Sequence, residues 1–452
     1  MTDLTLTKDQ QDTISFMYNG DESIIVADTG EGKTVMCLTA MKELLDSGAH
    51  KRFIVAVPAK VLAKDVWLRE VGKWRHLDGL VIRQLKGAPA TRAHELNCDN
   101  PQVIVVSLNN LDWLLTTQAH AATGIVIDEL SKAAGKQTRS LRSKKYGARF
   151  TWRCGLTASP VSQNLEKLFK MARIIDGGAS LGTNQSKFEV KYFTEDYNGH
   201  ELTLREGAAE QILDAVAPLV HMMPFNKEEK LPPLVFHEIK FSMPKDTLAL
   251  YETMKSDMVV EVEADLIDAI DNTEPPNFED QDIIIDAANA AVNVGKLRQI
   301  ASGFMYQDRE RTRIVRLDQE RLLAACGWWT ELEGRPGLVF YEFVEQEKLL
   351  KAWAPETVEI AQINSMSHGV EGLQHQYADL LFFQPVWSRD AFIQGYGRLW
   401  RTGQTKQVNV TTLMCDASVD HIVTQRVKGN AEWMELLKSH MRGSRRGYDT
   451  LT

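Results

Sequence analysis

The sequence predicts an α/β protein of two lobes, each a parallel β-sheet flanked by helices. Short apolar runs alternate with amphipathic stretches in the first third of the chain, and the same alternation begins again after residue 334. The length of 452 residues suffices for two or three domains with separate cores. With 44% hydrophobic and 25% charged residues, the chain is neither disordered nor fibrous.

The expected first lobe spans residues 1–230. A helical pattern covers 202–217, and the sequence KLPP at 230–233 is typical of a linker into a new unit. The expected strands are the apolar runs Ser23–Ala27, Phe53–Val57, Val103–Ser107 and Gly124–Ile127. Ligands of parallel sheets bind at the carboxyl ends of the strands, so the residues after each run are the ones to inspect for chemistry.

The expected second lobe spans residues 231–452. Helical patterns at Lys245–Met258 and Ala287–Ser302 flank an acidic loop that contains proline. We therefore expect a helical insertion, at about 244–330, associated with this lobe. The expected strands are Leu338–Tyr341, Thr357–Ile360, Asp379–Phe383 and Val408–Leu413.

Composition bears on partners and compartment. The formal net charge is −9, so any contact with nucleic acid has to come from local basic patches. Five cysteines without a CxxC pair fit a reducing cytosol and offer no zinc site. We expect a cytoplasmic protein without membrane contact, in the host cytoplasm if the chain is viral, because no signal-peptide pattern and no apolar run of roughly 18 residues is present.

The strongest local signal is IIVADTGEGKT at 24–34, an apolar strand that runs into a glycine-rich turn and then a helix. This order is typical of a phosphate-binding loop, and it disfavours the alternative of a tight turn with a solvated lysine. Lys33 would supply charge to the β and γ phosphates, and the Thr34 hydroxyl would bind Mg²⁺. The expected ATP-binding residues of the loop are Thr29, Gly30, Glu31, Gly32, Lys33 and Thr34.

Two adjacent carboxylates, Asp128 and Glu129, follow the fourth expected strand. Asp128 would hold Mg²⁺ through its water shell, and Glu129 would orient and deprotonate the attacking water. Paired acids after a strand also occur as helix N-caps, and the phosphate loop upstream favours the catalytic interpretation.

A third candidate group lies in the second lobe. On a helix, Gln394, Arg398 and Arg401 would share one face through i, i+4 and i, i+3 spacing. Two arginines on one face suit an arginine finger, which stabilises charge on the transferred phosphoryl group and would make hydrolysis depend on closure of the lobes. The alternative is a solvated basic face with Trp400 packed inward.

Together these motifs resemble those of superfamily-two helicases, most closely the Swi/Snf class of DNA translocases and its compact bacteriophage-type members. The resemblance covers most of the chain and extends to LTKDQ at 6–10, VP at 57–58, GLTASP at 155–160 and KLRQI at 296–300. It implies two RecA-like lobes with Mg²⁺ and ATP between them.

The resemblance also implies roles for single residues outside the phosphate loop. Gln10 corresponds to the glutamine that reads the adenine base, and Pro58 with Lys60 lies in the loop that touches the nucleic-acid backbone. Thr157 and Ser159 belong to the motif that couples the nucleotide site to the track.

A basic cluster without any acidic residue runs from 131 to 153. Its side chains could neutralise backbone phosphates, which positions a track without reading its sequence, although a charge run is most often a solvated face. The candidate contacts are Lys136, Arg139, Arg142, Lys144 and Lys145.

The expected function is ATP-dependent translocation, or unwinding, on duplex or branched DNA. The resemblance implies movement in the 3′ to 5′ sense along one strand. We expect a monomer, with replication or recombination proteins as potential partners. Two alternatives stay open at this point: an RNA helicase, and an ATP-switched clamp that binds DNA without stepping.

Overall fold

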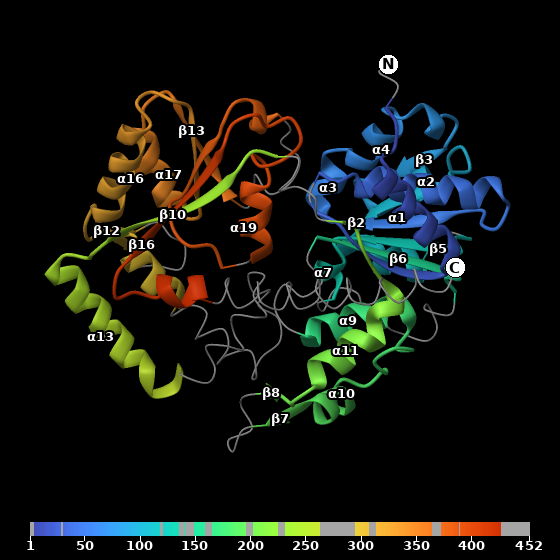
Figure 1. Ribbon diagram of the computed structural model, residues 1–452, viewed down its shortest axis with the longest axis horizontal. Helices are drawn as coiled ribbons and strands as arrows, with labels where there is room; N and C mark the ends of the chain where they lie inside the picture. Colours follow the sequence, from blue (N-terminus) through green and yellow to red (C-terminus); the bar gives the residue numbers. More distant parts are fainter. Residues whose placement is uncertain are drawn as a thin grey trace. The chain divides into compact units, whose positions relative to one another are not determined.

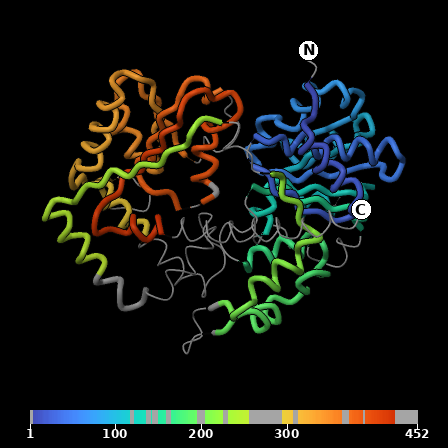
Figure 2. Tube along the Cα trace, viewed as in Figure 1, coloured from blue at the N-terminus to red at the C-terminus, as the bar shows by residue number. Residues whose placement is uncertain are grey.

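The computed structural model describes residues 4–425, apart from 29, 118–120, 135–140, 142–148, 159–164, 196–201, 225–230, 263–293, 307–312, 364–371 and 388. The chain divides into two compact units: residues up to 194 with 203–226, and residues 195–202 with 227–429. Figures 1 and 2 follow the chain through both units. Within the described residues, no helix combines the length and apolar character that crossing a membrane requires.

The first unit is built on a seven-stranded parallel sheet in the order β3-β4-β2-β5-β6-β1-β9 (Figure 1). A sheet of this kind needs helices on both faces because each strand is apolar on both sides. Its strands are β1 (Glu22–Val26), β2 (Phe53–Val57), β3 (Ile82–Gln84), β4 (Val103–Ser107), β5 (Gly124–Asp128), β6 (Trp152–Thr157) and β9 (Val220–Met222).

Two separate apolar cores cover the two faces of this sheet. Successive residues of β1 show the division, since Ile24 packs into one core and Ile25 into the other. One core holds α1 (Lys8–Asn19), α2 (Lys33–Asp46), α3 (Ala59–Ala63) and α4 (Val66–Val71). The other holds α6 (Leu108–Thr117), α7 (Leu130–Ala133), α9 (Leu165–Asp176), α10 (Gln185–Tyr192) and α11 (Ala208–Val216).

The second unit contains a five-stranded parallel sheet in the order β10-β16-β15-β13-β14. Its strands are β10 (Leu234–Phe241), β13 (Gly337–Tyr341), β14 (Val358–Gln362), β15 (Asp379–Phe382) and β16 (Val408–Cys415). One face packs against α19 (Arg389–Tyr396), and the other against α16 (Glu320–Glu331) and α17 (Val344–Trp353). Each unit is therefore a RecA-like α/β lobe with helices on both faces of its sheet.

Two smaller elements complete the structure. In the second unit, α13 (Lys245–Val262) and a helix at 294–300 pack with the residues after β16, next to a hairpin of β11 (Phe304–Tyr306) and β12 (Ile314–Arg316). The described parts of the expected insertion are helical at 245–262 and 294–300 and contain this hairpin, while its acidic loop and residues 287–293 lie outside the described residues. Strands β7 (Phe193–Glu195) and β8 (Leu202–Leu204) form a second small sheet.

All eight expected strands are confirmed to within one or two residues at each end. The helix expected over 202–217 is wrong in its first part, because residues 202–204 form β8 and Gly207, with φ at 71°, precedes the start of α11. Strand β6, the short strands β3 and β9 and the sheet-edge strand β10 were not expected, and neither were the small strands β7, β8, β11 and β12.

Candidate active site

The loop between β1 and α2 has the backbone that its glycines permit. Gly30 and Gly32 have φ angles of 92° and 85°, a region that residues with a side chain rarely adopt. A Cβ atom on Gly32 would lie 2.6 Å from Nε2 of Gln10, so a side chain there would displace the end of Gln10 from the loop. Gly32 is the N-cap of α2 and brings no capping side chain to the amides of the first helical turn. Such amides are where phosphate groups bind.

Two long side chains lie along this loop. Lys33 folds back so that Nζ donates to the carbonyl oxygens of Ala27 at 2.7 Å and Asp28 at 3.0 Å. Gln10 reaches the same loop from α1, where Nε2 donates to the carbonyl of Glu31 at 3.1 Å. Gln10 is held by a capping box with Thr7, which fixes its side chain at the start of α1.

The carboxyl ends of β1, β6 and β5 meet at one edge of the sheet. Thr157, the last residue of β6, pairs with Val26 of β1, and its carbonyl accepts from the amide of Ala27 at 3.1 Å. On the other side of β6, Asp128 pairs with Leu156. The phosphate loop, Thr157 and the Asp128–Glu129 pair therefore lie in one row, with β6 in the middle.

The Asp128 side chain is partly buried and lies beside Glu129, which carries the same negative charge. Burial, and then the neighbouring charge of Glu129, raise the pKa of Asp128 to about 6. A hydrogen bond from Trp67 and the positive charge of Lys33 act in the opposite direction. A cation at this position would relieve the repulsion between the two carboxylates, so the residues present fit Mg²⁺ held by Asp128 and Thr34.

Glu129 occupies the N-cap position of α7, but its side chain makes no capping hydrogen bond. Its backbone is left-handed, with φ and ψ both at 58°, a conformation that costs a residue with a side chain about 1 kcal/mol. Helix capping therefore does not explain why an acidic residue stands at this position. Backbone strain of this kind is common at functional sites.

The helix expected to carry Gln394, Arg398 and Arg401 on one face ends before the arginines. Helix α19 stops at Tyr396, and the amide of Arg398 bonds to the carbonyl of Gly395 at 3.2 Å, which is a tighter turn than an α-helix makes. The predicted shared helix face is therefore wrong, and glycines at 395 and 397 make a helix costly at this point.

Burial distinguishes these three side chains. Gln394 and Arg398 are 6% and 8% exposed, whereas Arg401 is half-buried. Arg398 is therefore not part of a solvated basic face. The indole of Trp400 donates to the carbonyl of Pro232 at 2.8 Å, which attaches this turn to the beginning of β10.

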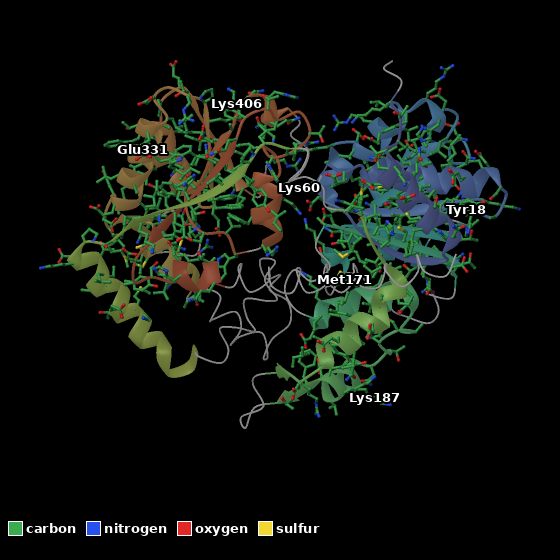
Figure 3. The ribbon with its side chains drawn as sticks, viewed as in Figure 1. Tyr18, Lys60, Met171, Lys187, Glu331 and Lys406 are labelled. Atoms are coloured by element: carbon green, nitrogen blue, oxygen red, sulfur yellow. The ribbon has the colours of Figure 1, made fainter. Side chains whose placement is uncertain are left out.

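The predicted nucleic-acid contacts are only partly within the structure. Pro58 is the N-cap of α3, and Lys60 is an exposed side chain on that helix (Figure 3). Seven other predicted site residues lie outside the described part of the chain: Thr29, Lys136, Arg139, Arg142, Lys144, Lys145 and Ser159.

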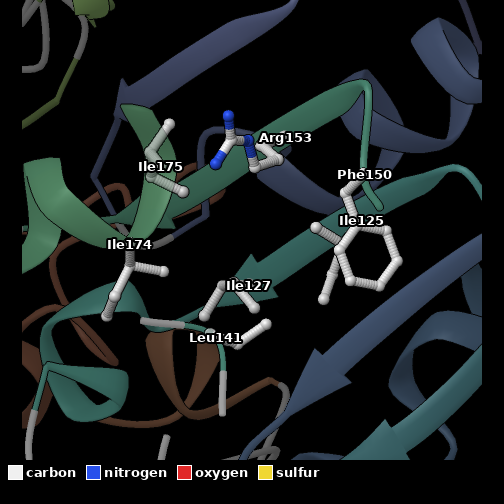
Figure 4. A pocket seen from close by; sticks show the side chains of 7 residues that line it. All are labelled: Ile125, Ile127, Leu141, Phe150, Arg153, Ile174 and Ile175. Carbon is white, nitrogen blue, oxygen red and sulfur yellow. The ribbon is translucent and has the colours of Figure 1, made fainter. Parts of the chain in front are cut away.

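A small cavity is lined by residues of β5, β6 and α9 (Figure 4). Its volume of about 10 Å³ has room for a single water molecule and not for a nucleotide. The lining is apolar apart from one arginine: Ile125, Ile127, Leu141, Phe150, Arg153, Ile174 and Ile175. We interpret it as a packing gap.

Trp67, to which the sequence gives no separate role, lies against the site. The Trp67 indole Nε1 donates to Oδ2 of Asp128 at 3.1 Å. The two residues are 61 positions apart, so no local pattern could have revealed the contact.

The chain is similar to several known proteins. Residues 7–168 match the DEAD/DEAH box helicase family. Protein p41 of Acyrthosiphon pisum secondary endosymbiont phage 1 is 25% identical over 468 residues, covering 95% of this chain and 97% of that protein. The chromatin structure-remodeling complex subunit snf21 of Schizosaccharomyces pombe is 24% identical over 91% of this chain, which spans only 37% of that longer protein.

A solved structure, the Sulfolobus solfataricus SWI2/SNF2 ATPase core in complex with dsDNA, is 17% identical. The similarity covers 93% of this chain and 90% of that one, with a TM-score of 0.44, which is too low to carry a conclusion. The helicase match and the relatives that extend along nearly the whole chain agree with the motifs and the two lobes. Residues 7–168 thus resemble a DEAD/DEAH box helicase domain, and the whole chain is similar to a phage protein and to a Swi/Snf-class remodelling subunit, which together support a nucleic-acid-dependent ATPase.

Proposed function

We propose that the protein uses ATP hydrolysis to move along duplex or branched DNA. The observation that carries the proposal is the row at the edge of the first sheet, where the phosphate loop, Thr157 and the Asp128–Glu129 pair follow three neighbouring strands. Hydrolysis requires the phosphate loop and the two carboxylates near one phosphate. Coupling to a track also requires a residue, here Thr157, whose position depends on both the nucleotide and the DNA.

Each residue of the first lobe has a task that follows from its chemistry. Amides beside Gly30 and Gly32 would bind phosphate oxygens, and the ammonium of Lys33 would exchange its two carbonyl contacts for them. Thr34 and Asp128 would hold Mg²⁺, which when bound neutralises phosphate charge. Glu129 would take the proton of the attacking water.

The second lobe would complete this set of residues. On closure, Arg398 and Arg401 would meet the γ phosphate, with Gln394 orienting the nucleophile, and an arginine finger accelerates phosphoryl transfer by about 10³–10⁵-fold. In this proposal the lobes span 1–230 and 231–452. Because the arginines and the phosphate loop are on different lobes, hydrolysis would depend on closure, and the lobes would alternate between open and closed arrangements.

The track would be held through its backbone. Lys60 on α3 and the basic side chains between 131 and 153 would neutralise phosphates without reading sequence. DNA is favoured over RNA because chromodomain-helicase-DNA-binding protein 8 of Xenopus tropicalis matches 35% of this chain and a chromatin structure-remodeling complex subunit matches 91% of it. Thr157 and Ser159 would transmit the state of the nucleotide to the track.

The direct test is steady-state ATP hydrolysis by the purified chain without polymer and with single-stranded DNA, duplex DNA, forked DNA or RNA. The matched control is Glu129→Gln, which keeps the size of the side chain and removes the base. We expect duplex or forked DNA to stimulate hydrolysis and the variant to stay at background. Stimulation by RNA alone would replace the proposal with an RNA motor.

A further inference from the structure

Trp67 connects two parts of the first lobe that the proposed function treats separately. Its side chain is 1% exposed, and its indole Nε1 donates to Oδ2 of Asp128 at 3.1 Å. Helix α4, which carries Trp67, follows α3 after only two residues, and α3 begins at Pro58, where the DNA backbone is expected to bind. A short segment therefore links the track to the carboxylate.

The segment between Pro58 and Trp67 is held together by local bonds. The amides of Val61 and Leu62 both donate to the carbonyl of Pro58, at 2.9 and 3.1 Å, which makes Pro58 the anchor of α3. Val61, Leu62 and Trp67 then pack into the same apolar core. A displacement at the start of α3 would accordingly be passed on to the indole, since closely packed interiors transmit strain.

The joint between α3 and α4 is the one strained point in this path. Asp65 is the N-cap of α4 and has a φ of 54°, in the left-handed region. The amide of Arg69 bonds to the carbonyl of Asp65 at 2.8 Å, and Lys86 Nζ contacts its carboxylate Oδ1 at 2.5 Å. The first bond starts α4, and the second is an exposed ion pair that ties the turn at Asp65 to Lys86.

An indole N–H that donates to one carboxylate oxygen restricts the rotation of that carboxylate. Oδ2 of Asp128 accepts from Trp67, and the backbone of Glu129 also donates to this carboxylate, so the indole is one of two bonds that orient the group. Mg²⁺ demands near-ideal octahedral geometry, so a small rotation of a carboxylate that holds its water shell changes its affinity.

We propose that Trp67 is a positioning residue that transmits DNA contact at Pro58 and Lys60 to the orientation of Asp128, so that binding the track tightens Mg²⁺–nucleotide. The inference rests on the proposed function, because it takes the DNA contact and the metal role of Asp128 from there. It adds the path by which DNA contact reaches Asp128, which runs along α3 and α4.

The test compares two matched substitutions. Trp67→Phe keeps an aromatic ring in the core and removes only the indole donor. Trp74→Phe is the control, because Trp74 is also buried, at 8% exposure, and also donates to a carboxylate, Oε1 of Glu70 at 2.8 Å. Both variants lose one indole–carboxylate bond, and only one of these bonds involves Asp128.

The readout is the Kd of a fluorescent, non-hydrolysable ATP analogue, measured by anisotropy with Mg²⁺ or EDTA, and with or without saturating duplex DNA. In the wild type and Trp74→Phe, Mg²⁺ tightens binding and DNA tightens it further. In Trp67→Phe we expect the Mg²⁺ effect to fall about 10-fold and the DNA effect to vanish, with the Kd in EDTA unchanged.

A second variant decides the matter if Trp67→Phe does not fold. Asp65→Gly accepts the positive φ without strain and leaves the Trp67–Asp128 bond in place, so it loosens only the joint. We expect its Mg²⁺ effect without DNA to match the wild type and its DNA effect to disappear. Retention of the DNA effect in Asp65→Gly or in folded Trp67→Phe overturns the inference and leaves the proposed function intact. If DNA changes neither affinity nor hydrolysis in the wild type, it is the proposed function that fails.

Discussion

Arg298 and Glu342 form a two-point ion pair in the second lobe, with Nη1–Oε1 and Nη2–Oε2 distances of 2.7 Å each. Arg298 comes from the helix at 294–300, and Glu342 directly follows β13. The same guanidinium donates to the carbonyl of Pro385 at 2.8 Å and lies over the ring of Trp387. The short KLRQI signature at 296–300 thus holds the ends of two strands and the segment that enters α19.

Removing this arginine should destabilise the second lobe. Arg298 is 2% exposed and Glu342 is 26% exposed, so the loss should lie at the lower end of the about 3–5 kcal/mol that truncation of one partner of a buried pair costs. For Arg298→Met we expect a loss of about 3 kcal/mol in the free energy of unfolding, measured by urea denaturation. Lys351→Met, which breaks the exposed pair with Glu347, is the control and should cost under about 1 kcal/mol. Equal losses would contradict a structural role for the pair.

Gly32→Ala should abolish nucleotide binding. The new Cβ would lie 2.6 Å from Gln10 Nε2 at a residue with positive φ, so either the loop or Gln10 has to move. Gly48→Ala is the control that separates backbone strain from the contact with Gln10. Gly48 also has a positive φ, at 74°, but its Cβ would meet nothing within 4 Å. We expect Gly48→Ala to lose about 1 kcal/mol of stability and to bind nucleotide normally. Calorimetric titration with ATP measures both variants.

Asp128 should make the metal-free protein less stable as pH rises. Its pKa is about 6 in the folded chain and about 4 when unfolded, so between these values the folded state holds more protons. Stability therefore falls as pH increases from about 4 to about 6, and the full cost persists above that window. Asp128→Asn removes the cost.

Urea denaturation in EDTA, at two pH values, measures this dependence of stability on the ionisation of Asp128. We expect Asp128→Asn to be more stable than the wild type by about 1–2 kcal/mol at pH 7.5, with little difference near pH 4. A gain of the same size at both pH values would show that ionisation of Asp128 is not the cause.

Gln10→Ala should weaken the preference for adenine. The carboxamide is held against the phosphate loop by its bond to Glu31, close to where a base could be read. A site that reads a base by hydrogen bonds loses most of its discrimination when the reader is removed. We expect the ratio of kcat/KM for ATP over GTP to fall about 10-fold. The neighbouring Gln11→Ala, which removes only an exposed contact with Leu6, should leave the ratio unchanged.

The sequence was most informative where one local pattern determines the structure. Buried parallel strands such as β2 and β4 are continuous apolar runs, and the phosphate loop needs its glycines in a fixed order. These elements were predicted within a residue or two. The three-residue strands β3 and β9 are too short for a periodic signal, and β10 at the sheet edge exposes Phe236 where a buried strand would not.

The errors and omissions concern tertiary structure. The spacing of Gln394, Arg398 and Arg401 fits a helix, but glycines at 395 and 397 allow the chain to turn after Tyr396. The bonds Trp67–Asp128 and Arg298–Glu342 join residues 61 and 44 positions apart, so only the folded chain brings them together.

The most direct test of the central claim is displacement of a third strand from duplex DNA. A fluorescent triplex-forming oligonucleotide is annealed to a duplex, and its release is followed after addition of protein and ATP, with Glu129→Gln as the control. We expect release that needs ATP and Glu129 and that slows as the duplex before the triplex is lengthened. Hydrolysis stimulated by duplex DNA without any release would contradict movement along DNA and leave a clamp that binds without stepping.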